Sequence, residues 1–423
     1  MIKNFTFALF ALTAINIQAQ EKALLDTLVQ KGYLSNQEAS IVARENVVVV
    51  PGSSETKSIR LTGGISSWYN WGNTNRSTGA SPSETNSFTM RYVKFGIEAD
   101  VGGGWDVKFI TDFGAEGADR NYIDIITISK NLDLGYTKGV VDFGFKKLSF
   151  GLEQIRGDFE QYAIERSVAT WFFTRPSITA SGARTNFGSR ATGIFFNGDV
   201  DGLQGLYYGL SLTGGATEDV SLNNNTSDLN KLSFFFNTGF KKDFIEEDKI
   251  SYDFGLNYGY ASGGSVSATG SSTIWGINPY VKLKWDNLNV IAEYFFQNIS
   301  NATTSGNGAS PHGANLIFSW RENLGEWGTI EPIFRYSYLD TNGATFNTNY
   351  GIDYFDKDGN ISSGLNFNIA NSVYFGANWY VVPAVKISLG YEFSVYDNLE
   401  NNTDSNKGDA TENSIKAQLQ VIF

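Results

Sequence analysis

Residues 250–260 read Ile250-Ser-Tyr-Asp-Phe-Gly-Leu-Asn-Tyr-Gly-Tyr260, and apolar residues alternate with polar residues or glycine along the whole stretch. This period of two is the pattern of a β-strand whose two faces meet different surroundings. The same alternation returns in residues 384–394 and in residues 413–423 at the end of the chain. These segments therefore predict amphipathic strands with one apolar and one polar face.

Working outward from residues 250–260, we expect an all-β protein with sixteen strands. They are placed at residues 59–71, 88–100, 105–113, 122–130, 138–147, 189–198, 204–214, 231–243, 250–260, 274–285, 289–297, 313–321, 329–339, 368–379, 384–394 and 413–423. Short connections, such as residues 102–104 and 286–288, alternate with long polar ones. An even strand number with this asymmetry of connections is typical of an antiparallel transmembrane β-barrel of the bacterial outer membrane.

The N-terminal residues differ in character from the rest of the chain. Residues 1–19 combine Lys3 with an apolar stretch and a small residue, Ala19, which is the pattern of an export signal. In residues 20–58, leucines recur at helical spacing, and Ser35 with Glu38 resembles a capping box. We therefore expect a periplasmic helical hairpin and linker over residues 20–58, followed by the barrel over residues 59–423.

Composition excludes several classes of function. The 44 acidic and 32 basic residues give a net charge of -12, which argues against a nucleic-acid partner. The absence of cysteine excludes disulfides and thiolate chemistry. His312 is the only histidine and falls in a polar connection, so neither a histidine metal site nor a Ser-His catalytic triad in the wall is expected. We expect no enzyme activity and no cofactor.

Residues 356–360, Asp-Lys-Asp-Gly-Asn, resemble the first half of a calcium-binding loop. The sixth position is Ile361 instead of glycine, and the twelfth is Phe367 instead of glutamate. Because the EF-hand needs both a sharp turn and a bidentate carboxylate there, the segment is interpreted as a polar turn.

The longest connection, residues 148–188, is long enough to fold into the barrel and narrow it. Residues 167–198 contain no acidic residue but include Arg175, Arg184 and Arg190, and Arg166 directly precedes them. Guanidinium groups at a constriction would attract phosphate or carboxylate. In the alternative interpretation, the arginines pair with acidic residues of the same connection, Glu153, Asp158, Glu160 and Glu165.

The predicted polar face of the wall carries both signs of charge. Its lysines are Lys94, Lys108, Lys146, Lys282, Lys284 and Lys386. Its acidic residues are Asp100, Asp106, Asp112, Asp142, Asp253, Glu293 and Glu392. A mixed wall of this kind does not by itself predict the ion selectivity of a channel.

Several segments resemble the phosphate-selective porin O and P family, in the family's order and over nearly the whole chain after residue 20. They are residues 24–38, residues 91–100 with Trp105, residues 150–154, residues 164–167, residues 332–340 and residues 378–386. The resemblance implies a homotrimeric porin of sixteen strands, which in some members has an arginine and lysine lining that binds phosphate or polyphosphate. It also implies that Glu165 and Arg166 belong to the constriction loop.

The arginines of this chain depart from the pattern of the family's phosphate-binding members, which carry a long arginine ladder and a lysine cluster. Here the relevant region has only Arg156, Arg166, Arg175, Arg184 and Arg190. We therefore predict an outer-membrane porin for passive diffusion of small hydrophilic solutes or anions, with lipid and a homotrimer as partners. The alternative is a barrel with a closed lumen that serves as an anchor or adhesion scaffold.

Overall fold

The computed structural model describes residues 47–50, 57–76, 83–114, 122–174, 187–214, 232–245, 249–262, 273–300, 308–342, 369–397 and 409–423. The expected export signal lies outside these residues, as does most of the expected helical hairpin and linker. Arg175, Arg184 and the calcium-like turn at residues 356–360 also lie outside them.

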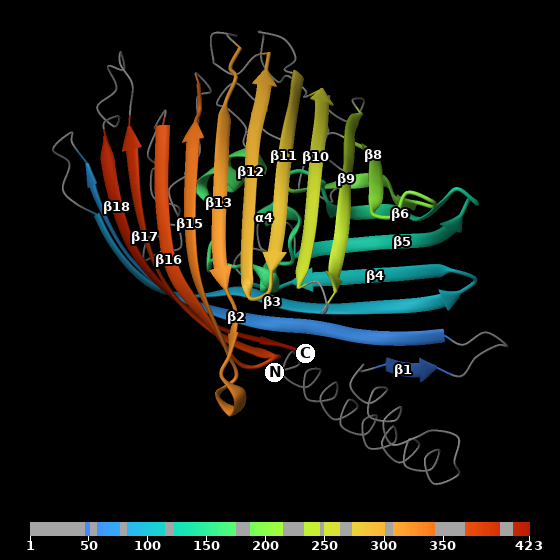
Figure 1. Cartoon of the computed structure of the whole chain (residues 1–423), viewed down its shortest axis with the longest axis horizontal. Coiled ribbons are helices and arrows are strands. Elements are labelled where there is room, and N and C mark those ends of the chain that lie inside the picture. Colours follow the sequence, from blue (N-terminus) through green and yellow to red (C-terminus); the bar gives the residue numbers. More distant parts are fainter. Residues whose placement is uncertain are drawn as a thin grey trace, which may run out of the picture.

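The described chain folds into a closed antiparallel barrel of sixteen strands, as the alternation predicts (Figure 1). The barrel strands are β2 (Lys57–Arg76), β3 (Ser83–Gly102), β4 (Trp105–Asp112), β5 (Ile123–Asp133), β6 (Thr137–Lys147), β7 (Arg190–Val200), β8 (Leu206–Thr213), β9 (Ser233–Ile245), β10 (Ile250–Ser262), β11 (Thr273–Trp285), β12 (Leu288–Ile299), β13 (His312–Trp320), β15 (Thr329–Asp340), β16 (Ile369–Val382), β17 (Val385–Asp397) and β18 (Ala410–Ile422). Strand β18 closes the barrel against β2, with Ile422 opposite Gly64 and Ala410 opposite Arg76.

Two short strands lie outside the cycle of sixteen. Strand β1 (Val47–Val50) pairs with residues 57–60 of β2, and β14 (Glu322–Asn323) pairs with the first residues of β15. The helical elements are α4 (Leu152–Ile155), η1 (Asp158–Glu160), α5 (Val168–Thr174) and η3 (Gly325–Trp327). In the described residues, no helix is both long enough and apolar enough to span a membrane.

The first hairpin is longer than the alternation predicts, because β2 extends to Arg76 and β3 begins at Ser83. Polar residues continue the ladder there, with Asn73 opposite Glu84. Backbone pairing needs no apolar face once the strands leave the apolar part of a membrane, so alternation underestimates their length. His312 was expected in a connection and is instead the first residue of β13.

The two ends of the barrel differ in their connections. Short turns join β3 to β4, β5 to β6, β7 to β8, β9 to β10, β11 to β12, β13 to β15 and β16 to β17, and the chain ends at this same short-turn end (Figure 1). The other connections lie at the long-loop end, and all of them except the one between β2 and β3 are longer than these turns. In outer-membrane barrels, short turns face the periplasm and long loops face the outside.

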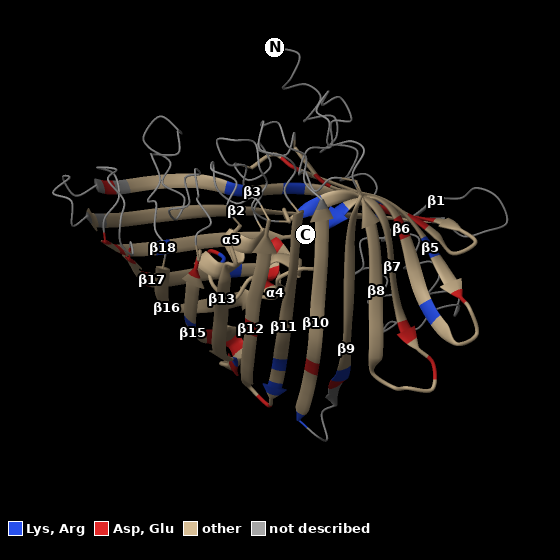
Figure 2. Ribbon diagram, turned by 90° about the horizontal axis from the view of Figure 1, so that it is seen from above, with Lys and Arg blue, Asp and Glu red and all other residues tan. Residues whose placement is uncertain are grey.

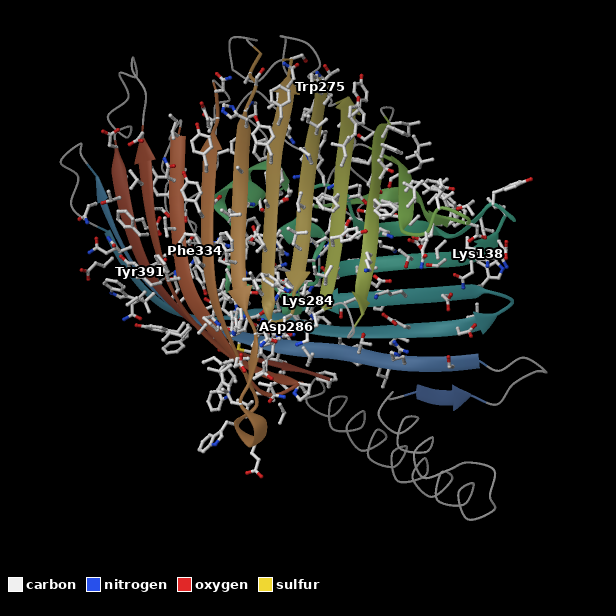
Figure 3. The ribbon with its side chains drawn as sticks, in the orientation of Figure 1. Lys138, Trp275, Lys284, Asp286, Phe334 and Tyr391 are labelled. Carbon is white, nitrogen blue, oxygen red and sulfur yellow. The ribbon has the colours of Figure 1, made fainter. Side chains whose placement is uncertain are left out.

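The two faces of the wall differ as a membrane barrel requires. Outward side chains are apolar and exposed, such as Phe254 at 45% and Leu389 at 60% exposure. Phe334 and Tyr391 lie on this outer face of β15 and β17 (Figure 3). Inward side chains on the same strands are polar, and Asn257 and Ser388 are buried. An apolar outer surface with paired backbone groups suits lipid, which cannot form hydrogen bonds.

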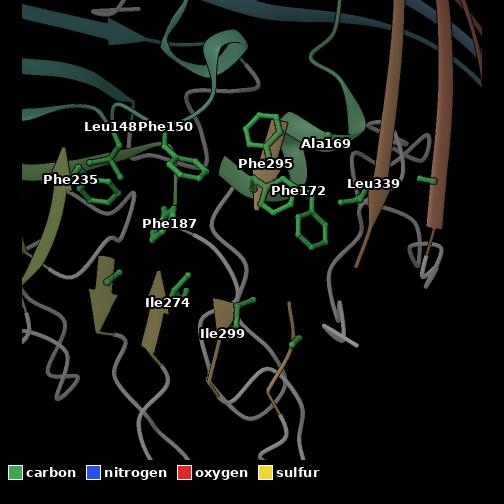
Figure 4. Close-up of a cluster of buried hydrophobic side chains, with 14 of the residues drawn as sticks. Leu148, Phe150, Ala169, Phe172, Phe187, Phe235, Ile274, Phe295, Ile299 and Leu339 are labelled. Atoms are coloured by element: carbon green, nitrogen blue, oxygen red, sulfur yellow. The ribbon is translucent and has the colours of Figure 1, made fainter. Parts of the chain in front are cut away.

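Inside the barrel, the long-loop half contains an apolar cluster (Figure 4). Phe172 and Phe173 of α5 pack there with Phe295 of β12, and the rings of Phe173 and Phe295 stack at 4.9 Å between centroids. The wall contributes small or aliphatic residues near the strand ends: Ala261, Ile274, Ile299, Leu339, Ala370 and Ala410. Burial of this apolar surface holds the connection after β6 against the wall.

Candidate functional site

The connection between β6 and β7 lies inside the barrel, where α4 and α5 are surrounded by the wall strands (Figure 2). We call residues 148–174 the inner loop. Its turn into the lumen needs Gly151, which has φ 83°. A Cβ at this position would lie 3.0 Å from Thr174 Cγ2 and 3.2 Å from Phe295 Cε1. Only glycine combines this backbone conformation with such close packing.

Hydrogen bonds attach the inner loop to β11, β12, β13 and β15. The backbone N–H of Gly151 donates to Asn278 Oδ1 at 3.0 Å, and that of Leu152 donates to Glu293 Oε2 at 2.7 Å. Asn315 Nδ2 donates to Thr170 Oγ1 of α5 at 2.9 Å. The free N–H groups at the start of a helix thus bind polar side chains of the wall.

The middle of the inner loop is attached to β16, β17 and β18. The carbonyl oxygen of Phe159 accepts hydrogen bonds from Gln420 Nε2 at 2.8 Å and Lys386 Nζ at 3.3 Å. Asn378 Nδ2 donates to the carbonyl oxygen of Tyr162 at 3.0 Å. The loop is therefore held across the lumen and not along one side of it.

A buried group of charges joins the inner loop to β3–β7. We call it the basic network, and its members are Lys94, Asp112, Asp124, Lys147, Asp158, Arg166 and Arg190. At its centre, Asp158 pairs with Lys94 and Arg166. Lys147 Nζ lies 3.1 Å from Asp158 Oδ1. Arg190 Nη2 lies 3.6 Å from Asp158 Oδ2 and 2.5 Å from Asp124 Oδ1.

Asp158 lies in η1 of the inner loop and is almost completely buried. Burial by itself would raise the pKa of its carboxyl group. The opposing charges of Lys147, Lys94 and two arginines outweigh that effect and hold the pKa well below its usual range. Asp158 is therefore an anion at neutral pH and is surrounded by basic side chains.

Asp124 is a residue of the candidate site that the alternation pattern misses. Strict alternation places it on the outer face with Ile126 and Ile128. In the structure, Ile110 pairs with Ile125 and Thr111 with Ile123, so Asp124 is an extra residue in β5. A β-bulge of this kind redirects a side chain. Asp124 thereby points inward, where Lys94 Nζ donates to it at 2.7 Å.

A second buried group, the balanced network, joins the inner loop to β15, β17 and β18. Its members are Glu153, Arg335, Glu392 and Lys416. Arg335 lies between the two glutamates, 3.2 Å from Glu153 Oε1 and 2.9 Å from Glu392 Oε1. Lys416 Nζ lies 3.2 Å from Glu392 Oε2. Two cations thus face two carboxylates.

Four of the predicted site residues lie in the described part of the chain, and they differ in burial. Arg166 and Arg190 are buried in ion pairs of the basic network, as the alternative interpretation of the arginines expects for Arg166. Glu165 is also buried, 3.6 Å from Arg91, and accepts a hydrogen bond from Trp171 Nε1. Arg156 is half-buried instead. A role of these residues in anion binding stays a prediction.

Among the predicted arginines that the structure describes, Arg156 is the most exposed. Its guanidinium group stacks on the ring of Tyr162 at 3.9 Å from the centroid, and Nε donates to the carbonyl oxygen of Glu160. Tyr162 also lines one of the pockets of the lumen. Stacking on an aromatic ring leaves part of the guanidinium edge available to a solute.

Two pockets lie in the short-turn half of the lumen. The first has a volume of about 450 Å³ and charged lining residues of both signs: Arg60, Glu98, Asp100, Asp106, Lys108, Asp142 and Lys146. The second, of about 250 Å³, has a lysine-rich lining: Lys241, Lys242, Asp243, Asp253, Lys282 and Lys284. Lys284 lies at the short-turn end of β11, close to Asp286 (Figure 3). The two pockets are on separate arcs of the wall and differ in charge.

A closed antiparallel barrel with an apolar outer face and a long connection folded inside defines the class of outer-membrane porins. The sequence profile of the phosphate-selective porin O and P family matches residues 61–229 and 268–423. The chain belongs to this family and is a protein of the bacterial outer membrane. None of the curated proteins compared with the chain matches it.

Solved structures with a similar fold include other porins. An anion-selective porin from Comamonas acidovorans has a TM-score of 0.57 and 11% identity, covering 87% of this chain and all of the other. OmpF of Salmonella typhi, in complex with daunomycin, has a TM-score of 0.54 and 15% identity, covering 88% and 100%. The outer-membrane channel DcaP of Acinetobacter baumannii has a TM-score of 0.52 and 11% identity, covering 89% and 100%. At these identities the likeness concerns the fold.

Within the described residues, no group of three or more histidine, cysteine or acidic side chains is arranged to hold a metal ion.

Proposed function

We propose that this porin allows passive diffusion of small hydrophilic solutes and prefers anions. The observation that carries the anion preference is the second pocket, where four lysines face two aspartates. Lys241 pairs with Asp199 at 3.2 Å and Lys282 with Asp253 at 2.5 Å, but the two lysine side chains remain 42% and 41% exposed, so solutes in the lumen reach their charges. A surplus of lysines in a narrow aqueous space raises the local concentration of anions.

The inner loop narrows the lumen in this proposal. It crosses between the wall that carries the basic network and the wall that carries the balanced network, so solutes pass beside it. The anion preference then comes from Arg156 and the lysines of the second pocket. Arg166 and Arg190 do not contribute, because their ion pairs with carboxylates are buried, whereas those of the pocket lysines are partly exposed. The similar fold of the porin from Comamonas acidovorans, which is described as anion-selective, is consistent with an anion preference of this chain.

The test is the reversal potential of the purified protein in a planar bilayer across a KCl gradient. We expect anion preference, and a shift toward cations in the double variant Lys241→Gln/Lys282→Gln. Lys138→Gln is the matched control, because Lys138 lies at the short-turn end of β6, is 65% exposed and does not line the second pocket (Figure 3). A cation-selective wild type, or equal potentials in the double variant and the wild type, would contradict the proposal.

The family resemblance further supports a homotrimer. In the same proposal, residues 1–19 direct export and are removed, and residues 20–58 lie in the periplasm. Mass measurement of the protein extracted from outer membranes tests both points. A mature chain that retains residues 1–19, or a monomer in native mass spectrometry under conditions that preserve porin trimers, would contradict them.

The second candidate function is a closed barrel that serves as an anchor or adhesion scaffold. The apolar cluster favours it, because Phe172, Phe173 and Phe295 are completely or almost completely buried in the long-loop half of the lumen. Bilayer conductance separates the two functions. Absence of conductance in a correctly folded protein would support the closed barrel.

A further inference from the structure

Four cations converge on one carboxylate in the basic network. Lys94 and Arg166 pair directly with Asp158, Lys147 lies 3.1 Å from it, and Arg190 lies 3.6 Å from it. Three of the four come from wall strands β3, β6 and β7, whereas Asp158 comes from the inner loop. The exposed fraction of these five side chains does not exceed 12%.

The four cations of this network share the inner loop's carboxylate. All four contact Asp158, and Lys94 and Arg190 also contact Asp124. Loss of Asp158 would therefore remove a negative charge from the point where the four basic groups converge. A buried charge that loses a partner is costly, so the remaining site would attract an anion from solution. Two guanidinium groups also supply the paired N–H donors that match planar or tetrahedral oxyanions.

We propose that Lys94, Lys147, Arg166 and Arg190 form a binding site for a small oxyanion, which Asp158 fills as a tethered substitute. The site is distinct from the lysine-lined second pocket and does not depend on the anion preference of the pore. A tethered carboxylate has a high effective concentration at its site, so a free anion competes poorly with it. Solute anions therefore pass the wild-type lumen without being captured at this position.

The test is anion rescue of an Asp158→Ala variant of the full chain, purified in detergent. Formate, inorganic phosphate and chloride are added at matched ionic strength, and the midpoint of unfolding is measured. We expect a saturable upward shift of the midpoint with formate that is absent from the wild type, because ligands that bind only the folded state stabilise it. A similar shift with phosphate shows that the site also admits a tetrahedral anion.

Glu293→Ala is the matched control. Glu293 is another buried carboxylate that binds the inner loop, but its hydrogen-bond donors are the neutral groups of Leu152, Asn278 and Asn315. Its removal leaves no surplus of cations, so we expect no shift with formate. An equal shift in both variants, or an equal shift with chloride, would show screening only and would overturn the proposal.

Asp158→Ala can fail to fold without an anion. The second variant is then Asp158→Ser, and the second measurement is the yield of refolding from urea with and without formate. The proposal expects formate to increase the yield of both variants and not that of the wild type. No gain in midpoint or yield with formate in either variant would overturn it.

Discussion

The basic network and the balanced network hold the same inner loop in different ways. In the balanced network, Arg335 of the wall is placed between a glutamate of the loop and a glutamate of the wall, and the charges cancel. In the basic network, Asp158 of the loop contacts four cations. Two networks of similar burial therefore depend to different degrees on a single residue.

Removal of a single cation should destabilise the two networks to different degrees. Removal of a cation from the balanced network leaves more carboxylates than cations in a buried space. Removal of one cation from the basic network leaves Asp158 in contact with three others. The energetic cost of losing one partner depends mainly on the uncompensated charge that remains.

The largest effect is expected for Arg335→Met. The substitution removes the cation that pairs with Glu153 and leaves Glu392 with Lys416. It also removes the hydrogen bond to the carbonyl oxygen of Glu165. We expect the free energy of unfolding to fall by about 3–5 kcal/mol. Urea unfolding in detergent micelles measures this free energy. If Arg335→Met costs no more stability than substitution of an exposed arginine, the balanced network does not hold the inner loop as described.

A smaller effect is expected for Arg166→Met, which removes a guanidinium of similar burial from the basic network. Asp158 keeps Lys94, Lys147 and Arg190 as partners. We expect a loss of about 1.5–3 kcal/mol, the usual cost of a hydrogen bond to a charged group. The same urea series measures it. If Arg166→Met costs more than Arg335→Met, the distinction between the networks is wrong.

The pH dependence of stability sharpens the comparison at Asp158. Its pKa in the folded protein is held well below the usual range, so it stabilises the fold above the unfolded-state pKa of about 3.9. That contribution is lost as pH falls through the folded-state pKa. We therefore expect the difference in stability between the wild type and Asp158→Asn to shrink below about pH 4. Urea midpoints from neutral to acidic pH test this, and a difference that grows at low pH would contradict it.

The smallest effect is expected for Arg60→Ala in the first pocket. Arg60 is 51% exposed and lies 3.9 Å from Glu98. Exposed ion pairs of this kind contribute about 0–1 kcal/mol, because water and salt screen them. The urea midpoint of the variant should stay close to that of the wild type. If Arg60→Ala lowers the free energy of unfolding as much as Arg166→Met does, the exposed ion pair contributes as much as a buried one and the account is wrong.

Much of the wall is predictable because alternation is a local property of the chain. In residues 250–260, the polarity of each residue predicts whether its side chain lies on the inner or the outer face of the wall. Strand β10 begins at Ile250, as predicted. The prediction is less accurate where the strands leave the membrane, as in β2 and β3, because polar residues there no longer alternate with apolar ones. Aromatic residues at strand ends, such as Trp285 and Trp320, are likewise visible in the sequence.

The candidate site was harder to predict. Charge alone indicates that residues 166–190 carry four arginines and no carboxylate, but it does not show that Arg190 pairs with Asp124, which is far away in the sequence. Asp124 itself is directed inward by a bulge that no alternation pattern contains.

By itself, the sequence determined that this chain forms a wide amphipathic barrel with a long connection after the fifth strand, because strand periodicity and loop length are local. Only the tertiary structure decided which charges are available to a solute. Asp158 meets Lys94 across 64 positions of sequence, and Glu153 meets Arg335 across 182. Such pairs exist only after the barrel closes around the inner loop, and burial there holds Arg166 and Arg190 in ion pairs that the sequence alone does not show.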